Sequence, residues 1–252
     1  MSSDNVRIGT SGFSYRDWLG NFYPQFCPQA DFLRYYSSQF KTVEIDMTFY
    51  RLPTADMVKR WAKVTPDGFV FTAKFPRMVT HEGTLEDRLA AARSFVEVMS
   101  HLGDKLGPLL LQFPYSFKPD QIDMLKAIVE SLPPGGQFAV EVRNRRWLEV
   151  DEMLELLTAR GISLCLVDHP WMPRVNVQTG GFQYIRFLGD QRKIESDFSY
   201  VRDGREDDLT WWGDLITGYA RNGVTCYVYF NNHFSGHAPT TASRLQQLID
   251  QA

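Results

Sequence analysis

The stretch Thr42-Val-Glu-Ile-Asp-Met-Thr-Phe-Tyr50 decides how the chain is interpreted, because it has the composition of a buried strand and yet carries two carboxylates. Side chains alternate between the two faces of a strand, so Glu44 and Asp46 point the same way, about 7 Å apart. An unpaired buried carboxylate costs several kcal/mol, so cations, a metal ion or water must meet these two groups. The nature of that partner is the central question that the sequence poses.

Eight β-rich runs, this one included, recur along the chain and mostly alternate with helical patterns. They are Val6–Thr10, Thr42–Met47, Phe69–Phe75, Pro108–Phe113, Phe138–Arg143, Ile162–Asp168, Gln183–Leu188 and Thr225–Phe230. Strand–helix units in series predict a parallel sheet, and eight of them in about 250 residues predict a TIM-type (β/α)8 barrel. We therefore expect an α/β fold in which residues 1–252 form a single barrel domain.

Helix boundaries are marked by residues that cap helices. Thr84 and Asp87 match a capping box ahead of one helix, and Gly161 stands where another helix should end. Between Asp168 and Gln183 there is no helical pattern, so we expect the sixth helix of the barrel to be missing. A doubly wound sheet would need a glycine-rich phosphate turn after its first strand, and Gly9-Thr-Ser-Gly12 is too short for one.

The bulk composition limits the classes of partner. The 252 residues are 44% hydrophobic and carry a formal net charge of −3, which predicts a sizeable core and no global attraction to nucleic acid or to an anionic membrane. The chain has no run of about 18 apolar residues, and its polar start, Met1-Ser-Ser-Asp-Asn5, differs from a signal peptide. Cys165 and Cys226 lie in apolar runs, so we expect buried thiols, a cytoplasmic location and no membrane partner.

Polar side chains gather at the carboxyl ends of the predicted strands, where barrel enzymes place their active sites. We predict catalytic roles for four carboxylates and one lysine: Glu44, Asp46, Lys74, Glu141 and Asp168. Arg143 and Arg186 add two positive charges, so neighbouring cations can largely neutralise the carboxylates, and Lys74 is the first expected counter-ion. The alternative is an ion-pair network that only fills the end of the barrel, with Glu141 and Arg143 as its best example.

A second set of residues is predicted to bind the substrate. It comprises Tyr15, Trp18, Tyr50, Gln112, Arg143, Arg186, Asn231, Asn232, His233 and His237. Tyr15 and Trp18 belong to an aromatic loop that either packs as a lid or offers rings for stacking on bases and sugars. The asparagines and histidines after the last strand suit a phosphate or a sugar, although turn hydrogen bonds would explain them as well.

A metal site is the less favoured interpretation of these histidines. His233 and His237 are four residues apart, but they flank Ser235-Gly236 in a loop, where they do not share one face of a helix. The chain also lacks the Walker A loop, the Gly-x-Ser-x-Gly elbow and the His-Glu-x-x-His motif. We therefore predict no metal ion and no cofactor.

Several blocks of sequence, in order, resemble those of a known family. They are Arg7-Ile-Gly-Thr-Ser-Gly-Phe-Ser-Tyr15, Val43-Glu-Ile-Asp-Met-Thr-Phe-Tyr50, Phe71-Thr-Ala-Lys-Phe-Pro76, Leu110-Leu-Gln-Phe-Pro114, Glu141-Val-Arg143, and Asn231-Asn-His233 followed by Gly236-His-Ala238. From about Arg7 to Leu248 the chain resembles the YecE-like family, domain of unknown function 72. The resemblance implies a TIM-type barrel, related in shape to the xylose-isomerase-like and endonuclease-IV-like barrels, and it brings no established reaction.

The chain departs from this family at the seventh strand. Many members have Arg-x-His-Gly there, whereas this chain has Arg186-Phe-Leu-Gly189. No role of that histidine is therefore carried over.

Three functions stay open. The favoured one is a metal-independent enzyme that binds a small anionic ligand, phosphate- or sugar-like, and uses Lys74 with a strand-end carboxylate for general acid–base chemistry. The first alternative is a non-catalytic module that binds nucleic acid, a nucleotide or a protein partner. The second is a metal-dependent phosphodiesterase that resembles the endonuclease-IV-like barrels.

Overall fold

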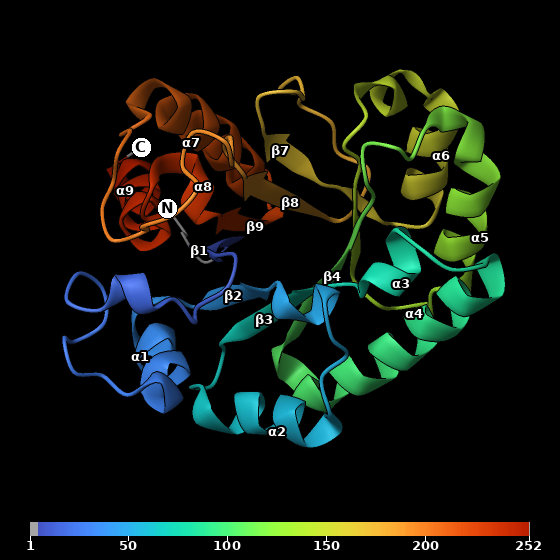
Figure 1. The fold of residues 1–252 in the computed structure, drawn as a ribbon. Coiled ribbons are helices and arrows are strands. Elements are labelled where there is room, and N and C mark those ends of the chain that lie inside the picture. Colours follow the sequence, from blue (N-terminus) through green and yellow to red (C-terminus); the bar gives the residue numbers. More distant parts are fainter. Residues whose placement is uncertain (1–4, 252) are drawn as a thin grey trace. The chain divides into compact units, whose positions relative to one another are not determined.

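The structure is a computed structural model that describes residues 5–251, and its strands form two parallel sheets (Figure 1). One sheet has the strand order β1-β9-β8-β7, and the other has the order β2-β3-β4-β5-β6. Parallel neighbours need a crossover connection between them, and helices supply most of these connections. The expected parallel α/β class is therefore confirmed.

The chain divides into two compact units. Among the described residues, the terminal unit contains residues 5–44, Leu166–Asn176 and residues 182–251. The central unit contains Ile45–Cys165 and Val177–Gly181. A single barrel domain over residues 1–252 stays a prediction.

In the terminal unit, β1 (Val6–Thr10) pairs with β9 (Thr225–Phe230), β9 with β8 (Phe182–Phe187), and β8 with β7 (Leu166–Asp168). Nearly every residue of these strands is buried, which explains their aromatic and branched composition. Gly9 of β1 lies against the backbone of the chain at Thr42. A Cβ atom at Gly9 would come within 2.2 Å of the Thr42 carbonyl oxygen, so no larger residue fits there.

The helices of the terminal unit include two that pack beside each other and against β9, α7 and α9 (Figure 1). Their buried sides carry large apolar residues such as Trp212 and Leu245, each of which stabilises the unit by about 1.5–3 kcal/mol on burial. The helices and 3₁₀ turns are η2 (Arg16–Trp18), η3 (Gln29–Asp31), α1 (Phe32–Gln39), α7 (Glu206–Arg221), α8 (Asn232–Ser235) and α9 (Ala238–Gln251).

Within residues 5–251, the sheet of the central unit has five strands, of which all but the last lead into a helix or a 3₁₀ turn. Its strands are β2 (Thr42–Ile45), which reaches this unit at Ile45, β3 (Val70–Lys74), β4 (Leu106–Gln112), β5 (Phe138–Glu141) and β6 (Ser163–Leu164). Its helices and turns are η4 (Met47–Phe49), α2 (Ala55–Val64), α3 (Arg77–Thr80), α4 (Leu85–Met99), η5 (Ser100–Lys105), η6 (Pro119–Gln121), α5 (Ile122–Ser131), η7 (Arg145–Glu149) and α6 (Asp151–Ala159). The capping box of Thr84 and Asp87 at the start of α4 is confirmed.

The sixth predicted strand is divided at Cys165, which the sequence did not indicate. Ser163 and Leu164 pair with β5, whereas Leu166–Asp168 pair with β8. The amide of Cys165 still donates to the carbonyl oxygen of Val140 at 2.8 Å, so the strand changes its partner within one residue. This change of partner separates the two sheets.

The predicted lack of a helix after this strand is confirmed. Residues 169–181 contain neither helix nor strand. In the central unit, Thr179 fixes the end of this segment, because its hydroxyl donates to the carbonyl oxygen of Ile162 at 2.6 Å and accepts from the amide of Leu164 at 2.8 Å. The side chain of Thr179 thus satisfies one backbone carbonyl group and one backbone amide group.

Two further expectations concern the surroundings of the chain. None of the helices within residues 5–251 is long and apolar enough to cross a membrane. Cys165 and Cys226 are buried as expected, and burial raises the pKa of the Cys226 thiol to about 12. That thiol is therefore protonated and unreactive at neutral pH.

Candidate functional site

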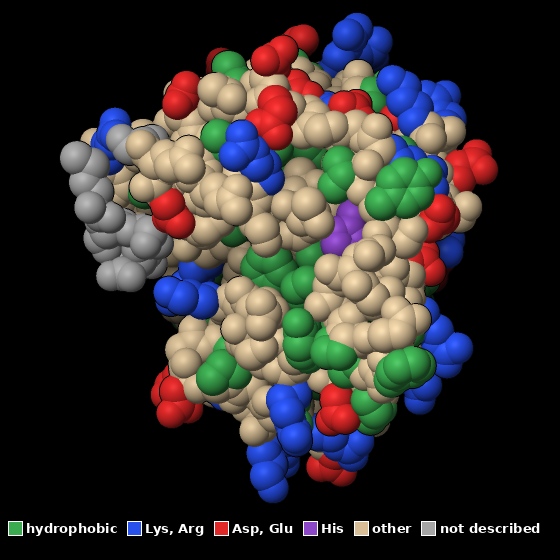
Figure 2. All heavy atoms as spheres, turned by 90° about the vertical axis from the view of Figure 1, so that its left-hand side faces the viewer, with side chains coloured by type: hydrophobic (Ala, Val, Ile, Leu, Met, Phe, Trp, Pro, Cys, Tyr) green, Lys and Arg blue, Asp and Glu red, His purple; other side chains and the backbone are tan. Residues whose placement is uncertain are grey.

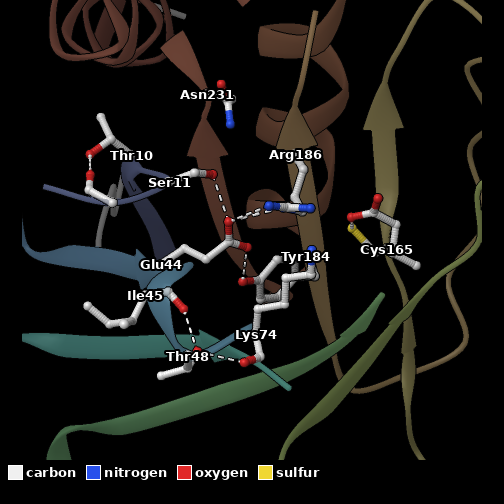
Figure 3. Close-up of polar contacts among 12 residues, drawn as sticks. Thr10, Ser11, Glu44, Ile45, Thr48, Lys74, Cys165, Tyr184, Arg186 and Asn231 are labelled. Atoms are coloured by element: carbon white, nitrogen blue, oxygen red, sulfur yellow. Dashed lines mark hydrogen bonds and ion pairs between the residues drawn. The ribbon is translucent and has the colours of Figure 1, made fainter. Parts of the chain in front are cut away.

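The Glu44 carboxylate, fully buried in the terminal unit, accepts hydrogen bonds from three side chains (Figure 3). Its Oε1 accepts from the Ser11 hydroxyl at 2.7 Å and from Nη2 and Nε of Arg186 at 2.7 and 3.1 Å. Its Oε2 accepts from the hydroxyl of Tyr184 at 2.6 Å. For Glu44, one arginine and two hydroxyl groups therefore meet the buried charge. We refer to Ser11, Glu44, Tyr184 and Arg186 as the Glu44 cluster.

Strand geometry explains how this cluster forms. Tyr184 and Arg186 are alternate residues of β8, so their side chains lie on the same face. Ser11 directly follows β1 and is bridged to Glu44, where the amide of Gly12 donates to the Glu44 carbonyl oxygen at 2.7 Å. Side chains from β8 and from the end of β1 thus meet one carboxylate on β2.

Within the Glu44 cluster, Tyr184 keeps its hydroxyl proton at neutral pH and therefore remains a hydrogen-bond donor to Glu44. Burial, followed by the neighbouring carboxylate of Glu44 and by Tyr229, raises the pKa of Tyr184 well above its usual value of 10.0, so its hydroxyl stays a donor. Glu44 accepts four hydrogen bonds in all, three of them on Oε1. A general base needs a lone pair for the substrate's proton, so these contacts suit a positioning group better than a base.

Asp168, at the end of β7, lies in an ion-pair network. Its Oδ2 accepts from Arg174 Nη2 at 2.7 Å and from Trp212 Nε1 at 2.8 Å, and its Oδ1 accepts from Arg205 Nη2 at 3.1 Å. Both arginines also pair with Asp208. Two carboxylates and two guanidinium groups balance one another here, which favours the structural alternative for Asp168.

Two residues of the aromatic loop, Trp18 and Tyr23, pack inward. Trp18 and Tyr23 are fully buried, and Tyr23 stacks on Phe32 with 4.0 Å between ring centroids. Tyr15 is half-buried and lies 4.7 Å from Trp18, ring to ring. The rings of Trp18 and Tyr23 therefore pack against other residues of the protein and are not exposed for stacking on a ligand.

Asn231 and His233 make the turn hydrogen bonds that the sequence left as an alternative. The side-chain oxygen of Asn231 caps α8 by accepting from the amide of His233 at 3.0 Å. Nδ1 of His233 contacts the carbonyl oxygen of Ile194. Asn232 and His237 both lie beside Trp18. The indole Nε1 of Trp18 donates to Oδ1 of Asn232 at 3.2 Å, and the ring centroid of His237 lies 6.1 Å from that of Trp18.

In the central unit, Lys74 ends β3 beside an aromatic ring. Its Nζ lies 3.8 Å from the ring centroid of Phe49, a cation–π contact. The carbonyl oxygen of Lys74 accepts from the hydroxyl of Thr48 at 2.6 Å (Figure 3), which fixes the strand end against η4. Phe49 also contacts His81, whose ring centroid lies 4.9 Å away at an interplanar angle of 74°. Lys74, Phe49 and His81 therefore form one group.

His81 experiences the charge of four cations. Burial, followed by the charges of Lys74, Arg77, Arg88 and Arg143 in that order, lowers its pKa from 6.5 to about 4. The imidazole is therefore neutral at pH 7. We refer to Lys74, Arg77, His81, Arg88 and Arg143 as the basic cluster.

Two carboxylates pair with members of the basic cluster. Glu141 is fully buried and pairs with Arg143, whose side chain is 23% exposed. Glu82 pairs with Arg77 at 3.0 Å. Arg143 and Arg77 are thus each paired with a carboxylate.

Sequence analysis identified Lys74 and Arg143 but missed the rest of the basic cluster. Arg77 and His81 follow β3 within one short segment, so their proximity to the Lys74 strand end was a usable signal. Arg88 lies on α4 and gave no such signal. Its guanidinium reaches back to the carbonyl oxygens of Val79 and Gly83, at 2.9 and 3.2 Å.

The remaining predicted residues of the central unit lie in varied surroundings. Gln112 is buried, and its Nε2 donates to the carbonyl oxygen of Phe113 at 2.7 Å, a structural contact. Asp46 is half-buried directly before η4. Tyr50 is 82% exposed.

A metal centre has no ready set of ligands in the described part of the chain. Residues 5–251 contain no group of three or more His, Cys, Asp or Glu side chains that could hold a metal ion. Arginines donate to the carboxylates of Glu44, Glu141 and Asp168. A metal ion would compete with these arginines for the same oxygen lone pairs.

Comparisons with known proteins agree with one another. A family model described as "Protein of unknown function DUF72" matches residues 7–252. The chain is 31% identical to UPF0759 protein YecE of Escherichia coli (strain K12) over 140 residues, which is 54% of this chain and 52% of YecE. The chain thus spans about half the length of that relative. It is 24% identical to UPF0759 protein YunF of Bacillus subtilis (strain 168), and that match covers 97% of this chain and 95% of YunF.

Solved structures give the same result. The crystal structure of a DUF72 family protein from Thermotoga maritima MSB8 has a TM-score of 0.80 and 29% sequence identity, and it covers 97% of this chain and 99% of that chain. A DUF72 family protein from Enterococcus faecalis V583 has a TM-score of 0.81 and 23% identity, and it covers 98% of this chain and 96% of that chain. The second likeness concerns the fold alone.

Proposed function

This chain belongs to the DUF72 family, whose description names no reaction, and we propose from its own residues that it is a metal-independent enzyme for a small anionic substrate. The substrate would bind at the basic cluster of the central unit. General acid–base chemistry would follow there, with Lys74 and His81 as the groups that carry protons. The chemical class that fits is a small phosphate ester or carboxylate.

The single observation that carries this proposal is the position of Lys74 over the Phe49 ring, which also contacts His81, with Arg77, Arg88 and Arg143 close enough to lower the pKa of that imidazole. Glu141 and Glu82 already pair with Arg143 and Arg77, and an anion beside His81 would be attracted by the same cations. Opposite unit charges about 4 Å apart attract by about 4 kcal/mol near a protein surface. A bound phosphate or carboxylate would therefore be favoured by several such interactions.

Each member of the basic cluster suits a distinct role. The guanidinium of Arg143 has planar paired donors that match a phosphate or a carboxylate. The ammonium of Lys74 is held over the Phe49 ring and supplies a compact charge. A neutral imidazole can accept a proton at pH 7, which makes His81 suitable for proton transfer. Proton abstraction beside a carbonyl, where negative charge develops, fits this set.

The nucleic-acid alternative receives less support. On the face shown in Figure 2, Lys and Arg side chains are interspersed with Asp and Glu side chains. Trp18 and Tyr23, which a stacking module would expose, are buried. These features favour a small ligand over a polyanion.

The test of binding uses His81 as its own probe. We expect inorganic phosphate to raise the pKa of His81 from about 4, because a bound anion neutralises the surrounding cations. Proton NMR of the imidazole ring measures this pKa at each phosphate concentration. Lys74→Gln should weaken phosphate binding about tenfold, which is about 1.4 kcal/mol. A pKa that stays the same at every phosphate concentration would overturn the proposed site.

The matched control is Lys59→Gln, the same change at an exposed residue of α2. It should change phosphate affinity less than about twofold, since screening weakens distant surface charges. Catalysis is then tested with a panel of small phosphate esters and carboxylates on protein treated with a chelator. Turnover that survives chelation and disappears in Lys74→Gln supports the proposal. Turnover that requires an added metal ion contradicts it.

A further inference from the structure

Exposed apolar side chains follow the ends of β2 and β3, two neighbouring strands of the central unit. The exposed fractions are 47% for Met47, 82% for Tyr50, 41% for Leu52 and 41% for Met78. Single exposed apolar residues are normal in soluble proteins, whereas several gathered together indicate a surface that binds something apolar. We refer to these four residues as the apolar rim.

The backbone beneath the apolar rim is fixed to both strand ends. The amide of Tyr50 donates to the carbonyl oxygen of Met47 at 3.1 Å. The hydroxyl oxygen of Thr48 lies 2.8 Å from the carbonyl oxygen of Ile45 and 2.6 Å from that of Lys74 (Figure 3). The exposed side chains are therefore carried by a segment that is bonded to β2 and to β3.

The Phe49 ring connects Tyr50 to the basic cluster. The ring centroid of Tyr50 lies 5.1 Å from that of Phe49, at an interplanar angle of 85°. Nζ of Lys74 lies 3.8 Å from the same Phe49 centroid, and the ring centroid of His81 lies 4.9 Å from it. The Tyr50 ring can be no farther from Lys74 Nζ than the sum of the two distances that meet at Phe49. One small molecule can therefore contact both groups.

Met78 adjoins the basic cluster through Gly83. A Cβ atom at Gly83 would come within 2.7 Å of Sδ of Met78, so the thioether lies against this glycine. The carbonyl oxygen of Gly83 accepts from Nε of Arg88 at 3.2 Å. Apolar side chains from the ends of both strands thus lie next to members of the basic cluster.

The residue types of the apolar rim suit an aromatic ring. Aromatic rings pair in offset or edge-to-face arrangements with centroids about 4.5–7 Å apart, and Tyr50 has an exposed ring for such a pair. Methionine sulfur contacts aromatic rings favourably, often at the ring edge. A nearby ammonium group, such as that of Lys74, attracts the face of a ring. An alkyl group would gain only the apolar part of these contacts.

We infer that the substrate is an aromatic anion, in which a ring is joined to the phosphate or carboxylate group. The anionic group would bind beside Lys74, and the ring would pack against Tyr50 and the methionines of the apolar rim. This inference rests on the proposed function, because it takes the basic cluster as the anion site. It adds that the apolar rim selects among small anions.

The experiment compares matched anions by isothermal titration calorimetry at pH 8, above the second pKa of a phosphate monoester, which is about 6. Phenyl phosphate and methyl phosphate carry the same charge and differ in the ring, and benzoate and acetate form the corresponding carboxylate pair. We expect the ring to tighten binding about tenfold in at least one pair. Equal affinities within both pairs would overturn the inference and leave the anion site intact. No binding of any of the four anions would contradict the proposed function as well.

Tyr50→Ala is the decisive variant, because it removes the exposed ring and none of the cations. The preference for the aromatic anion should fall below about twofold. Tyr50→Phe keeps the ring and should keep the preference.

The matched control is Tyr200→Ala, the same change at a tyrosine of the terminal unit that is 55% exposed. It should retain the full preference. A Tyr50→Ala protein that prefers the aromatic anion as strongly as this control contradicts the inference. Size-exclusion chromatography of the same proteins tests the other occupant, a second copy of the chain. A dimer that Tyr50→Ala dissociates would assign the apolar rim to an interface and overturn the inference.

Discussion

The Glu44 cluster contains a fully buried strand-end carboxylate that pairs with an arginine, and the basic cluster adjoins another, Glu141, and yet the two differ in access to solvent. Glu44 meets Arg186, whose side chain is 3% exposed, and two hydroxyl groups complete its shell. Glu141 meets Arg143, whose side chain is 23% exposed. The first arrangement satisfies its carboxylate within the protein. In the second, the arginine keeps access to solvent.

The largest effect should follow from breaking the closed pair. Glu44→Gln removes the charge that the guanidinium of Arg186 meets at 2.7 Å, so we expect the free energy of unfolding to fall by about 3–5 kcal/mol. Urea denaturation of both proteins measures the difference. The double variant Glu44→Gln/Arg186→Met removes both charges and should recover part of the loss. A loss under about 1 kcal/mol would mean that Glu44 is not the structural anchor of this cluster.

Tyr184→Phe should have the second largest effect. It removes the donor to Oε2 of Glu44, and a hydrogen bond to a charged group contributes about 1.5–3 kcal/mol. Tyr229→Phe is the matched control, because it removes a neutral bond of 2.7 Å between the Tyr229 hydroxyl and Thr42 Oγ1. A neutral pair contributes about 1 kcal/mol. Chemical denaturation of the two variants should rank Tyr184→Phe as the less stable, and the reverse order would argue against an ionised Glu44.

A smaller effect on stability is expected at the basic cluster. Glu141→Gln leaves Arg143 with access to water, so we expect a loss of about 1 kcal/mol, well below that of Glu44→Gln. The same change removes a negative charge and should tighten phosphate binding. Denaturation and a phosphate titration measure the two outcomes on one protein. Equal losses for Glu44→Gln and Glu141→Gln would erase the contrast between the clusters.

The smallest effect is the contribution of His81 to pH dependence. Its pKa is about 4 in the folded protein against 6.5 for the free side chain, so the folded state binds fewer protons between these values. Stability is then greatest above pH 6.5 and falls as the pH drops from 6.5 towards 4. Because His81 is partly exposed, we expect under about 1 kcal/mol from this residue. Thermal unfolding of the wild type and His81→Asn across pH 4–7 measures it, and phosphate should reduce the difference.

Much of the fold was predictable from local signals. The eight β-rich runs, the capping box of Thr84 and the missing sixth helix all depend on side chains close in sequence. The resemblance to the YecE-like family is confirmed by the family match over residues 7–252. The division of the sixth strand at Cys165 was missed, because pairing depends on which neighbouring strand lies within hydrogen-bond distance.

The candidate site was predictable only as a list of residues. Alternation along the strands correctly identified Glu44, Glu141, Asp168 and Arg186 as buried polar side chains. It paired Glu141 with Arg143, as the structure does, but it gave no indication of Arg174, Arg205 or His81 as neighbours. Charge balance made an arginine a plausible partner for Glu44, but the choice of Arg186 depends on distances across the sheet.

By itself the sequence determined that a carboxylate would be buried at Glu44, because a strand of that composition is stable only inside the protein. The tertiary structure alone decided that Arg186, 142 residues away, would meet it at 2.7 Å. It also decided that the Phe49 ring would contact both Lys74 and His81. Hydrogen bonds and ion pairs act over about 3 Å, and only the folded chain brings residues so far apart in sequence within that range.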